Sequence, residues 1–503
     1  MKTILFFSAA KNMLLLVFLL VTMGFNTNAQ VTVVQIGNDI DGEDSADYSG
    51  RAVSVNADGS VIAIGAPFHN GNGNFAGQVR VFNNSGGIWT QMGADIDGEY
   101  EGDRFGYSVS LSADGTVLAA GAPYYTDSLG HEGVIRIYRY IGNTWIKKGN
   151  IVSENILDLS GYSLSLNADG SVVAVSAPRT VADVGQVRIY KDSSGYWTQL
   201  GNSIDGEAAD DWSGYSVSLN ANGTTVAIGA IGNDGNGTDA GHTRVFHLSG
   251  GLWVQKGGDI DGDAAGDQSG LSVSISADGS VVATGAILNS DSLFEAGQVR
   301  VYQFSAGNWV QMGSNVYGYA TGEASGQSID LNADGSVVAI GVIGGNHHGD
   351  YTGLIRMYKY SAGNWSQIVN DIDGEADNNL FGYSVSVSDD GSVVAGGAPQ
   401  NDGSATDAGH ARVYRLVGLG INGHEVSPAF DISPNPVNDF LKINFCQPDK
   451  ATIEIFDIQG RKVIQGMSEG NSTYINTGEL NSGIYLIKYT GNTIISFEKF
   501  IKE

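Results

Sequence analysis

The sequence predicts an all-β fold: a seven-bladed β-propeller that an N-terminal strand closes, followed by a small C-terminal β-sandwich. The first observation is a repeat. The stretch FGYSVSLSADGTVLAAGAP at 105–123 returns with small changes along the chain, and its turn glycine recurs every 53–56 residues, at Gly59, Gly115, Gly170, Gly223, Gly279, Gly335 and Gly391. A fixed period of about 50 residues that carries several short strands is typical of one propeller blade per repeat.

The second observation is that each repeat contains four strand-like segments. In the third repeat they are 162–167, where apolar and small polar residues alternate, the continuous apolar run 171–178, and the shorter segments 185–190 and 196–202. Alternation is typical of a half-buried strand, and a continuous apolar run indicates a strand covered on both faces. The first two strands meet at Ala-Asp-Gly or a close variant, which tolerates the positive φ of a tight hairpin.

The third observation concerns the two ends of the repeat array. Six repeats carry a tryptophan in the fourth strand, whereas the seventh ends at ARVYRLVG (411–418) without a fourth strand. The N-terminal segment VVQIGNDIDG (33–42) aligns with WTQMGADIDG (89–98), and Val33 takes the tryptophan position. We therefore expect the N-terminal strand to complete the last blade, which removes free sheet edges.

The chain organisation and charge indicate an exported protein. Residues 1–29 combine Lys2 and Lys11 with a short apolar run and small residues, the pattern of a signal peptide, and the run is too short to span a membrane. Residues 30–420 form the predicted propeller, 421–430 a linker and 431–503 a second domain. Residues 30–425 hold 45 acidic and 17 basic side chains, which argues against a nucleic-acid partner, and the single Cys446 excludes an intrachain disulfide.

The repeat motif has a known counterpart. Phe105-Gly106 with Gly121-Ala122-Pro123, and Phe381-Gly382 with Gly397-Ala398-Pro399, resemble FG-GAP repeats, the propeller unit of integrin α-subunit heads. This resemblance implies a propeller fold but no single activity. Many FG-GAP repeats carry a calcium loop between their first two strands. Here that loop is only Ala-Asp-Gly, too short to surround Ca²⁺, so the calcium sites of the family are not expected.

The last 73 residues also resemble a known family. Their marks are Pro434-Asn435-Pro436, the Asp457 to Arg461 segment, and Gly483-Ile484-Tyr485-Leu486 before a lysine-bearing end. They resemble the C-terminal sorting domain of the Bacteroidetes type IX secretion system. The resemblance implies contact with the type IX machinery, export across the outer membrane, and release or attachment at the cell surface.

The candidate binding residues lie in the longer loops. In a four-stranded meander the second-to-third and fourth-to-first connections share one face, and here they are long and varied, as binding loops on a rigid scaffold are. Aromatic faces suit sugar rings and carboxylates accept hydrogen bonds from hydroxyl groups. We expect an extracellular glycan or protein ligand to contact this face, at Phe68, Tyr124, Tyr125, Trp212, Asp234, Asp239, His347 and His348. Solvated loops with no ligand remain the alternative.

Two further sets of repeated residues have a predicted role. Calcium is a possible cofactor of the acidic fourth-to-first loops, at Asp41, Glu43, Asp97, Glu99, Asp205, Glu207, Asp261 and Asp263, although the buried-looking isoleucines between the acids argue against a freely wrapping loop. An arginine occupies the same third-strand position in every repeat, at Arg80, Arg136, Arg188, Arg244, Arg300, Arg356 and Arg412. A half-buried guanidinium needs an acceptor, so we expect a structural role between strands or blades.

The sequence favours a binding protein over an enzyme. No GxSxG, HExxH or phosphate-binding loop occurs, and His242 and His410 fall where other repeats have glutamine, which favours a hydrogen-bonding strand residue over a catalytic base. We expect a secreted or cell-surface protein for adhesion or for attachment to a glycan or protein. The alternatives are a secreted carbohydrate-active hydrolase, since the many carboxylates could include an acid pair, and a purely structural surface or matrix protein.

Overall fold

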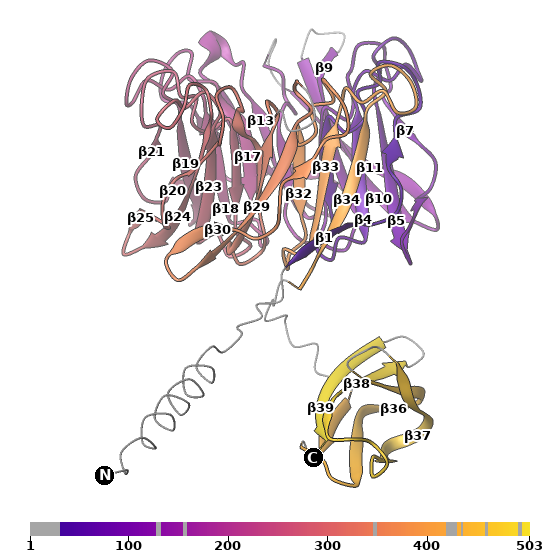
Figure 1. Ribbon diagram of the computed structural model, residues 1–503. Helices are drawn as coiled ribbons and strands as arrows, with labels where there is room; N and C mark the ends of the chain where they lie inside the picture. The colour runs from indigo at the N-terminus through magenta and orange to yellow at the C-terminus, as the bar shows by residue number, and fades with distance from the viewer. Residues whose placement is uncertain are drawn as a thin grey trace, which may run out of the picture. The chain divides into compact units, whose positions relative to one another are not determined.

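The computed structural model describes residues 31–126, 132–153, 158–345, 350–418, 430–433, 436–457, 461–490 and 495–502. The predicted signal peptide lies outside these residues, as does most of the predicted linker. The chain divides into two compact units, Met1–Leu419 and Gly420–Glu503 (Figure 1). Among the described residues, no helix is long and apolar enough to cross a membrane.

The first unit contains seven antiparallel sheets, which we number in chain order. Sheet 1 consists of β3 (Ala52–Val55), β4 (Val61–Ala66), β5 (Gln78–Ser85), β6 (Ile88–Gln91) and β7 (Ile96–Asp97). Sheet 2 consists of β8 (Ser108–Leu111), β9 (Val117–Thr126), β10 (Glu132–Ile141) and β11 (Thr144–Val152). Sheet 3 consists of β12 (Leu164–Leu166), β13 (Val172–Ala177), β14 (Gln186–Asp192), β15 (Trp197–Gln199) and β16 (Ile204–Asp205). A 3-10 turn, η1 (Val181–Asp183), lies between β13 and β14.

Sheets 4 to 7 repeat this arrangement. Sheet 4 consists of β17 (Ser213–Leu219), β18 (Thr225–Ala230), β19 (His242–Ser249), β20 (Leu252–Gln255) and β21 (Ile260–Asp261), and sheet 5 of β22 (Ser272–Ile275), β23 (Val281–Ala286), β24 (Gln298–Ser305), β25 (Asn308–Gln311) and β26 (Val316–Tyr317). Sheet 6 consists of β27 (Ser325–Leu331), β28 (Val337–Val342), β29 (Leu354–Ser361), β30 (Asn364–Gln367) and β31 (Ile372–Asp373). Sheet 7 consists of β32 (Ser384–Val387), β33 (Val393–Ala398), β34 (His410–Val417), β1 (Thr32–Gln35) and β2 (Ile40–Asp41).

The four strands expected in each repeat are present, and a short fifth strand, found among the described residues in every sheet of the first unit except sheet 2, was not expected. The second strand is buried along its length in six of the seven sheets, as its apolar run predicts; β4 and β13 are examples. In sheet 2 the end of β9, from Tyr124 to Thr126, leaves the core. The seven turn glycines all have positive φ, between 68° and 72°. The Asp-Ile-Asp segments, predicted as loop, instead form strands such as β2 and β7, because isoleucines like Ile40 and Ile96 are buried against the third strand.

The N-terminal strand pairs with the last repeat. β1 runs antiparallel to β34, with Val33 opposite Leu416. In sheet 4, Trp253 lies opposite Leu248 in the equivalent register, so Val33 does take the tryptophan position. β1 therefore supplies the fourth strand that the last repeat lacks.

Seven main-chain hydrogen bonds link the inner turns of successive sheets into a circuit. Each amide donates to the carbonyl of the next turn over 2.8–3.1 Å, in the order Ala57, Ala113, Ala168, Ala221, Ala277, Ala333, Asp389 and back to Ala57. A second circuit uses the side chains of the first strands. Each of these side chains accepts a hydrogen bond from a backbone amide of the next sheet, over 2.8–3.1 Å. The acceptors are Ser54, Ser110, Ser165, Ser218, Ser274, Asp330 and Ser386.

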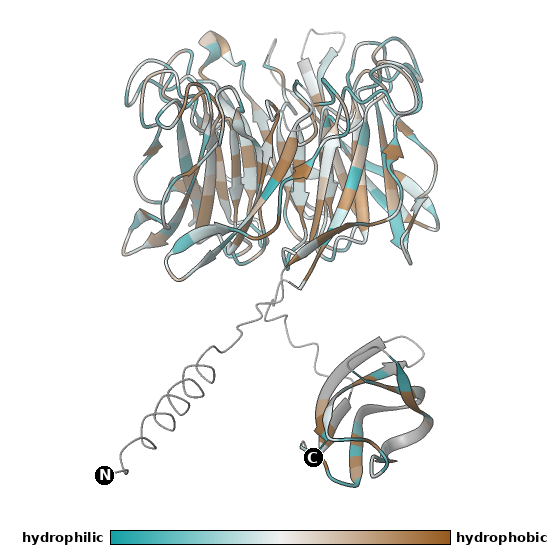
Figure 2. Cartoon of the chain, viewed as in Figure 1, coloured by the Kyte–Doolittle hydropathy of each residue, from teal (hydrophilic) through white to brown (hydrophobic). Residues whose placement is uncertain are grey.

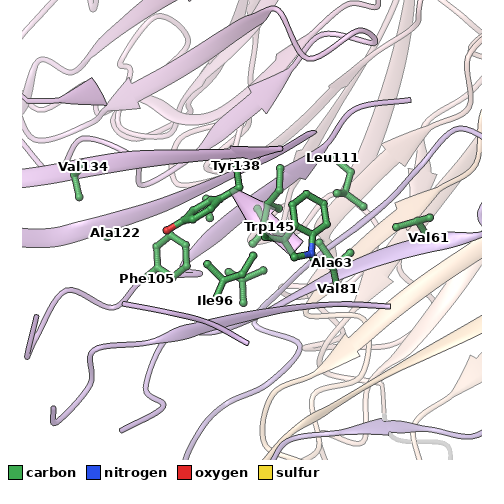
Figure 3. Close-up of a cluster of buried hydrophobic side chains, with 14 residues drawn as sticks. Val61, Ala63, Val81, Ile96, Phe105, Leu111, Ala122, Val134, Tyr138 and Trp145 are labelled. Atoms are coloured by element: carbon green, nitrogen blue, oxygen red, sulfur yellow. The ribbon is translucent and has the colours of Figure 1, made fainter. Parts of the chain in front are cut away.

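Apolar side chains pack between neighbouring sheets. Figure 3 shows the cluster between sheets 1 and 2, where Trp145, Tyr138, Phe105 and Ile96 are buried together. The Trp145 indole also donates from Nε1 to the Met92 carbonyl of the preceding sheet over 2.7 Å. Four other fourth-strand tryptophans make the same bond at 2.6–2.7 Å: Trp89, Trp253, Trp309 and Trp365. Each tryptophan thus fills the gap to the preceding sheet and satisfies its own N–H group.

The second unit is one antiparallel sheet of five strands, β35 (Phe430–Ser433), β36 (Phe440–Asp457), β37 (Lys462–Asn476), β38 (Gly483–Thr490) and β39 (Ile495–Lys502). β36 pairs with β35, β37 and β38, and β38 pairs with β39. Its core includes Leu441, Ile443, Ile455, Ile487 and Phe500. Alternating apolar residues on these strands account for one buried face.

Deleting residues 31–40 is expected to destabilise the whole first unit, because it removes β1 and exposes the edge of β34. We expect the melting temperature of the first unit to fall by roughly 3–6 °C, the effect of about 3–5 kcal/mol on a unit of this size. Thermal unfolding followed by circular dichroism measures this. As the control, removing residues 420–503 should leave the unfolding transition of the first unit unchanged. An unchanged transition after deletion of residues 31–40 would contradict a stabilising role of the β1–β34 pairing.

Replacing Asp330 by Ser is expected to change how stability depends on pH. Burial raises the pKa of Asp330 from 3.8 to about 6. Because the folded state holds this proton more tightly than the unfolded state, ionisation of Asp330 costs stability as pH rises from about 4 through 6. Ser occupies the position in the other six sheets, so Asp330→Ser should match wild type near pH 4 and exceed it by about 1–3 kcal/mol at pH 7.5. Urea unfolding at both pH values measures the difference in unfolding free energy between the variant and the wild type. If this difference were the same at the two pH values, the expectation would be refuted.

Candidate functional site

The third-strand arginines bind the segment that precedes their own sheet. Arg80, Arg244, Arg300 and Arg412 each donate from Nη2 to the carbonyl of an Asp in the preceding fifth strand, over 2.5–2.8 Å; these aspartates are Asp41, Asp205, Asp261 and Asp373. Because the fifth strand belongs to the previous sheet, each bond joins two sheets. All seven arginines, Arg188 included, are buried.

Two of the arginines have fully buried carboxylate partners instead. Arg136 lies 2.8 Å from Asp103, and Arg356 makes two bonds to Glu323, at 2.7 and 3.0 Å, together with an ion pair to Asp371 at 3.1 Å. Burial alone would lower the pKa of Arg356, but the bonds to Glu323 and Asp371 outweigh it and raise the pKa. These arginines lie between the sheets, as their structural role requires.

The eight acids proposed as calcium ligands lie around these arginines. Glu43, Glu207 and Asp263 are 3.5, 3.3 and 2.6 Å from Arg80, Arg244 and Arg300. Glu99 is 3.6 Å from Arg136 and pairs with Lys147. The side chains of Asp97 and Asp205 accept hydrogen bonds from the amides of Gln78 and Gln186. Asp41 lies 3.9 Å from His410, and Asp261 lies 4.0 Å from His242. Calcium binding by these loops stays a prediction.

The structure brings together only some of the predicted ligand-binding residues. Phe68 and Tyr124 lie on either side of Arg104, whose guanidinium is 5.0 and 4.1 Å from the two rings. Tyr124 and Tyr125 belong to β9, not to the loop in which they were expected. Trp212 and Asp234 belong to sheet 4, away from Phe68 and Tyr124. The Trp212 ring lies just before β17 and packs under the Arg179 guanidinium. Asp234 accepts a hydrogen bond from the Asp239 amide between β18 and β19. His347 and His348 lie outside the described residues.

Phe68 and Tyr124 are part of a continuous aromatic track across sheets 1 and 2. We use this name for Phe75, Phe68, Tyr48, Arg104, Tyr124 and Tyr107. The ring centroids of neighbouring aromatic members lie 5.0–6.1 Å apart, in tilted or edge-to-face arrangements. Phe75 is 45% exposed and Tyr124 36% exposed, so the track presents apolar faces to solvent.

The track ends in a cavity at the inner strands, which we call the axial pocket. It has a volume of 240 Å³, and residues just before and within the first strand of all seven sheets line it. One varied repeat position lines it, occupied by Arg51, Tyr107, Tyr162, Tyr215, Leu271, Gln327 and Tyr383. The next position adds a serine from six of the sheets, and Ala52 from the first. A second cavity, of 340 Å³, follows along the same strands towards the inner turns and contains Asp330.

Arg51 contacts the aromatic members of this lining on both neighbouring sheets. Its guanidinium lies 4.1 Å from the Tyr107 ring and 4.8 Å from the Tyr383 ring. Burial would lower the pKa of Arg51, but interactions with Tyr383, Tyr107 and Tyr162 outweigh it, so the group stays charged. Burial also raises the pKa of Tyr162, which keeps its hydroxyl neutral. The pocket therefore offers one fixed cation, several hydroxyl groups and aromatic faces.

Sequence reasoning missed the axial pocket because it searched the long loops. A signal was present: the residue directly before the first Ser or Ala of each first-strand segment is Arg51 in one repeat and Tyr, Leu or Gln in the others, whereas the positions that follow hardly change. Variation at one position of a constant repeat is typical of a position facing a shared site. Figure 2 shows hydrophilic colour in many loops of the first unit and hydrophobic colour on parts of many of its strands.

The predicted sorting residues in the second unit are partly described. The Tyr485 ring stacks on Phe500 with centroids 5.4 Å apart, and its hydroxyl donates to the Asn481 carbonyl over 2.9 Å. Gly483 pairs with Lys502, and Pro436 is exposed. Pro434 and Asn435 lie outside the described residues. Tyr485 and Gly483 line a cavity of 810 Å³ together with Asp457 and Arg461, which form an ion pair at 2.8 Å.

Replacing Arg356 by Met is expected to cost about 3–5 kcal/mol of unfolding free energy, because it leaves the buried Glu323 carboxylate without its cation. Arg412→Met is the matched comparison. Its carboxylate, Glu375, is largely exposed and stays hydrated, so we expect a smaller loss. Denaturant unfolding measures both variants. Adding Glu323→Gln to Arg356→Met should restore part of the stability, and no restoration would contradict the ion-pair assignment.

Comparison with known proteins supports the assignment of the second unit. Residues 431–503 match the family described as "Secretion system C-terminal sorting domain". The chain is therefore exported through type IX secretion to the cell surface or beyond, and its tail interacts with that machinery. No curated protein matches the chain.

Two solved structures are similar to part of the chain at low identity. A putative 6-phosphogluconolactonase from Bacteroides uniformis is 11% identical, with a TM-score of 0.46, and the match covers 65% of this chain and 86% of that one. U3-55K is 13% identical, also with a TM-score of 0.46, and the match covers 76% of this chain and 98% of that one.

Proposed function

We propose that the chain is a secreted or surface-displayed binding protein that attaches to an extracellular glycan through the aromatic track and the axial pocket. It acts by binding, without catalysis. Its scaffold is a closed seven-bladed β-propeller of the FG-GAP type. The observation that carries the proposal is the continuity of the aromatic track, from the exposed Phe75 in an outer loop to Tyr107 at the axial pocket.

Closure of the scaffold is supported by the two hydrogen-bond circuits and by the pairing of β1 with β34. In both circuits the seventh sheet bonds to the first, through Asp389 and Ala57 and through Ser386 and Val55. A closed ring has no exposed inner-strand edge, so the residues before the first strands converge on one axis. This convergence would turn seven single positions into one pocket.

The chemistry of the track suits a carbohydrate. Sugar rings present apolar C–H faces that pack on aromatic side chains, and hydroxyl groups that bond to guanidinium and phenol groups. Arg104 between Phe68 and Tyr124 supplies both kinds of contact in one place. The 240 Å³ axial pocket is smaller than the pockets that enclose drug-sized ligands, so it would hold the end of a chain and the track would hold the sugars that follow.

A glycan array probed with the full chain tests the proposal. We expect saturable binding to a subset of glycans, and Tyr124→Ala should weaken it on the order of tenfold, or about 1.4 kcal/mol. Tyr196→Ala is the matched control, because Tyr196 is also an exposed tyrosine but lies in the turn between β14 and β15. The control should bind as the wild type does.

Three outcomes separate the proposal from its rivals. Binding that Tyr124→Ala weakens, with no release of reducing sugar, supports attachment. Release of reducing sugar that depends on one carboxylate would instead indicate a hydrolase. Binding to no glycan would leave a structural role and would refute the proposed site.

A further inference from the structure

Two histidines of the first unit are buried without a hydrogen-bond partner. His242 on β19 and His410 on β34 are each 1% exposed, and neither ring nitrogen of either residue has a partner. A buried polar group without a partner costs free energy, and such groups are rare in folded proteins. The proposed glycan site makes no use of these residues, since they lie on the third strands and not at the axis.

Each ring faces a cluster of carboxylates at a distance too long for a hydrogen bond. His410 Nδ1 is 3.7 Å from Asp39 and 3.9 Å from Asp41. His242 Nδ1 is 4.0 Å from both Glu207 and Asp261. In each cluster the ligand atoms of one His, one Asp and one Glu all lie within 4.8 Å of one another; the sets are His410, Asp39 and Glu375, and His242, Asp259 and Glu207.

The two clusters are built from the same repeat positions. The His is the first residue of the third strand in its sheet, the Asp precedes that sheet's fifth strand, and the Glu follows the fifth strand of the previous sheet. The same arrangement has therefore arisen twice in one chain, in sheets 4 and 7. For His410 the Asp comes from the N-terminal segment, between β1 and β2.

The glutamines that replace these histidines in other sheets behave differently. Gln78 donates to Glu43 over 3.0 Å, Gln186 to Asp205 over 2.5 Å and Gln298 to Asp263 over 3.0 Å. These amide nitrogens reach the carboxylates directly. The Nδ1 atoms of His242 and His410 stay 3.7–4.0 Å from the nearest carboxylate oxygens, which leaves a gap where these other sheets have a hydrogen bond.

The charge of each cluster favours a cation. Arg412 and Arg244 each lie 3.3 Å from the Glu of their cluster. Each cluster holds three carboxylates, counting Asp41 or Asp261, for this one guanidinium. The excess of carboxylates around an unpartnered imidazole suits a bound metal ion better than a further neutral group.

We propose that each cluster binds one divalent transition-metal ion of the zinc class, held by the His nitrogen and by the Asp and Glu oxygens. Zinc takes this mixture of nitrogen and oxygen ligands, whereas calcium prefers oxygen alone. Two ligands at about 2.1 Å from a tetrahedral ion lie about 3.4 Å apart. The shortest His–carboxylate distances in the two sets are 3.7 and 4.0 Å, and all ligand atoms of a set lie within 4.8 Å of one another, so the side chains would have to close inward by up to about 1.4 Å. The ions would tie sheet 3 to sheet 4, and sheets 6 and 7 to the N-terminal segment.

Zinc content and thermal unfolding of the full chain test the proposal. The chain is stripped with a chelator, reloaded with ZnCl₂ and desalted before the metal is measured. His242→Gln and His410→Gln should each lose one zinc equivalent relative to wild type, and the double variant should lose two. The variants should fold, because Gln occupies the equivalent position at Gln78, Gln186 and Gln298. His247→Gln, on the same strand β19, is the matched control and should keep the wild-type content.

Stability gives the second readout. Because an ion that binds only the folded state raises the melting temperature, ZnCl₂ should raise it in wild type and in His247→Gln but not in the double variant. CaCl₂ should give no response that depends on the two histidines. Wild-type zinc content in a folded double variant would overturn the proposal, and so would an equal calcium response that both histidines control.

Discussion

The main-chain hydrogen bonds that pass from one inner turn to the next are the constraint on which the first unit depends. They fix the distance between neighbouring first strands, because each turn both donates to one neighbour and accepts from the other. The serine hydroxyls and the Asp330 carboxylate form a second set of bonds between neighbouring first strands, in which each accepts a hydrogen bond from a backbone amide of the next sheet. No sheet can then shift without breaking bonds to two others.

Every larger feature of the unit follows from that spacing. With the inner strands held, the sheets diverge outward, and large side chains fill the widening gaps. The tryptophans occupy the outermost part and donate their N–H groups to the preceding sheet. The arginines occupy the edge near the long loops and bind carbonyl and carboxylate oxygens of the preceding segment. Among the described residues, eight carboxylates pair with these buried arginines, whereas most of the acidic side chains have no such cation and the net charge is −28.

The two candidate sites use different consequences of the repeat. The axial pocket collects one position from all seven sheets, so seven different side chains meet once. The histidine clusters instead lie between neighbouring sheets, so the same three residue types meet twice. Sequence divergence between repeats creates the first kind of site. The recurrence of His, Asp and Glu at equivalent positions of two repeats creates the second.

The sequence by itself determined the period, the four main strands of each repeat, the hairpin glycines and the missing strand that Val33 and its neighbours supply. These are local properties, set by alternation, turn chemistry and register. It also determined the route of export, because the sorting domain is a contiguous motif. The tertiary structure decided which side chains meet. Asp39 reaches His410 only because the chain ends pair, and Arg51 reaches both Tyr107 and Tyr383 only because the first and last sheets are neighbours. Such contacts depend on how the sheets are arranged around the axis, and no spacing along the chain encodes them.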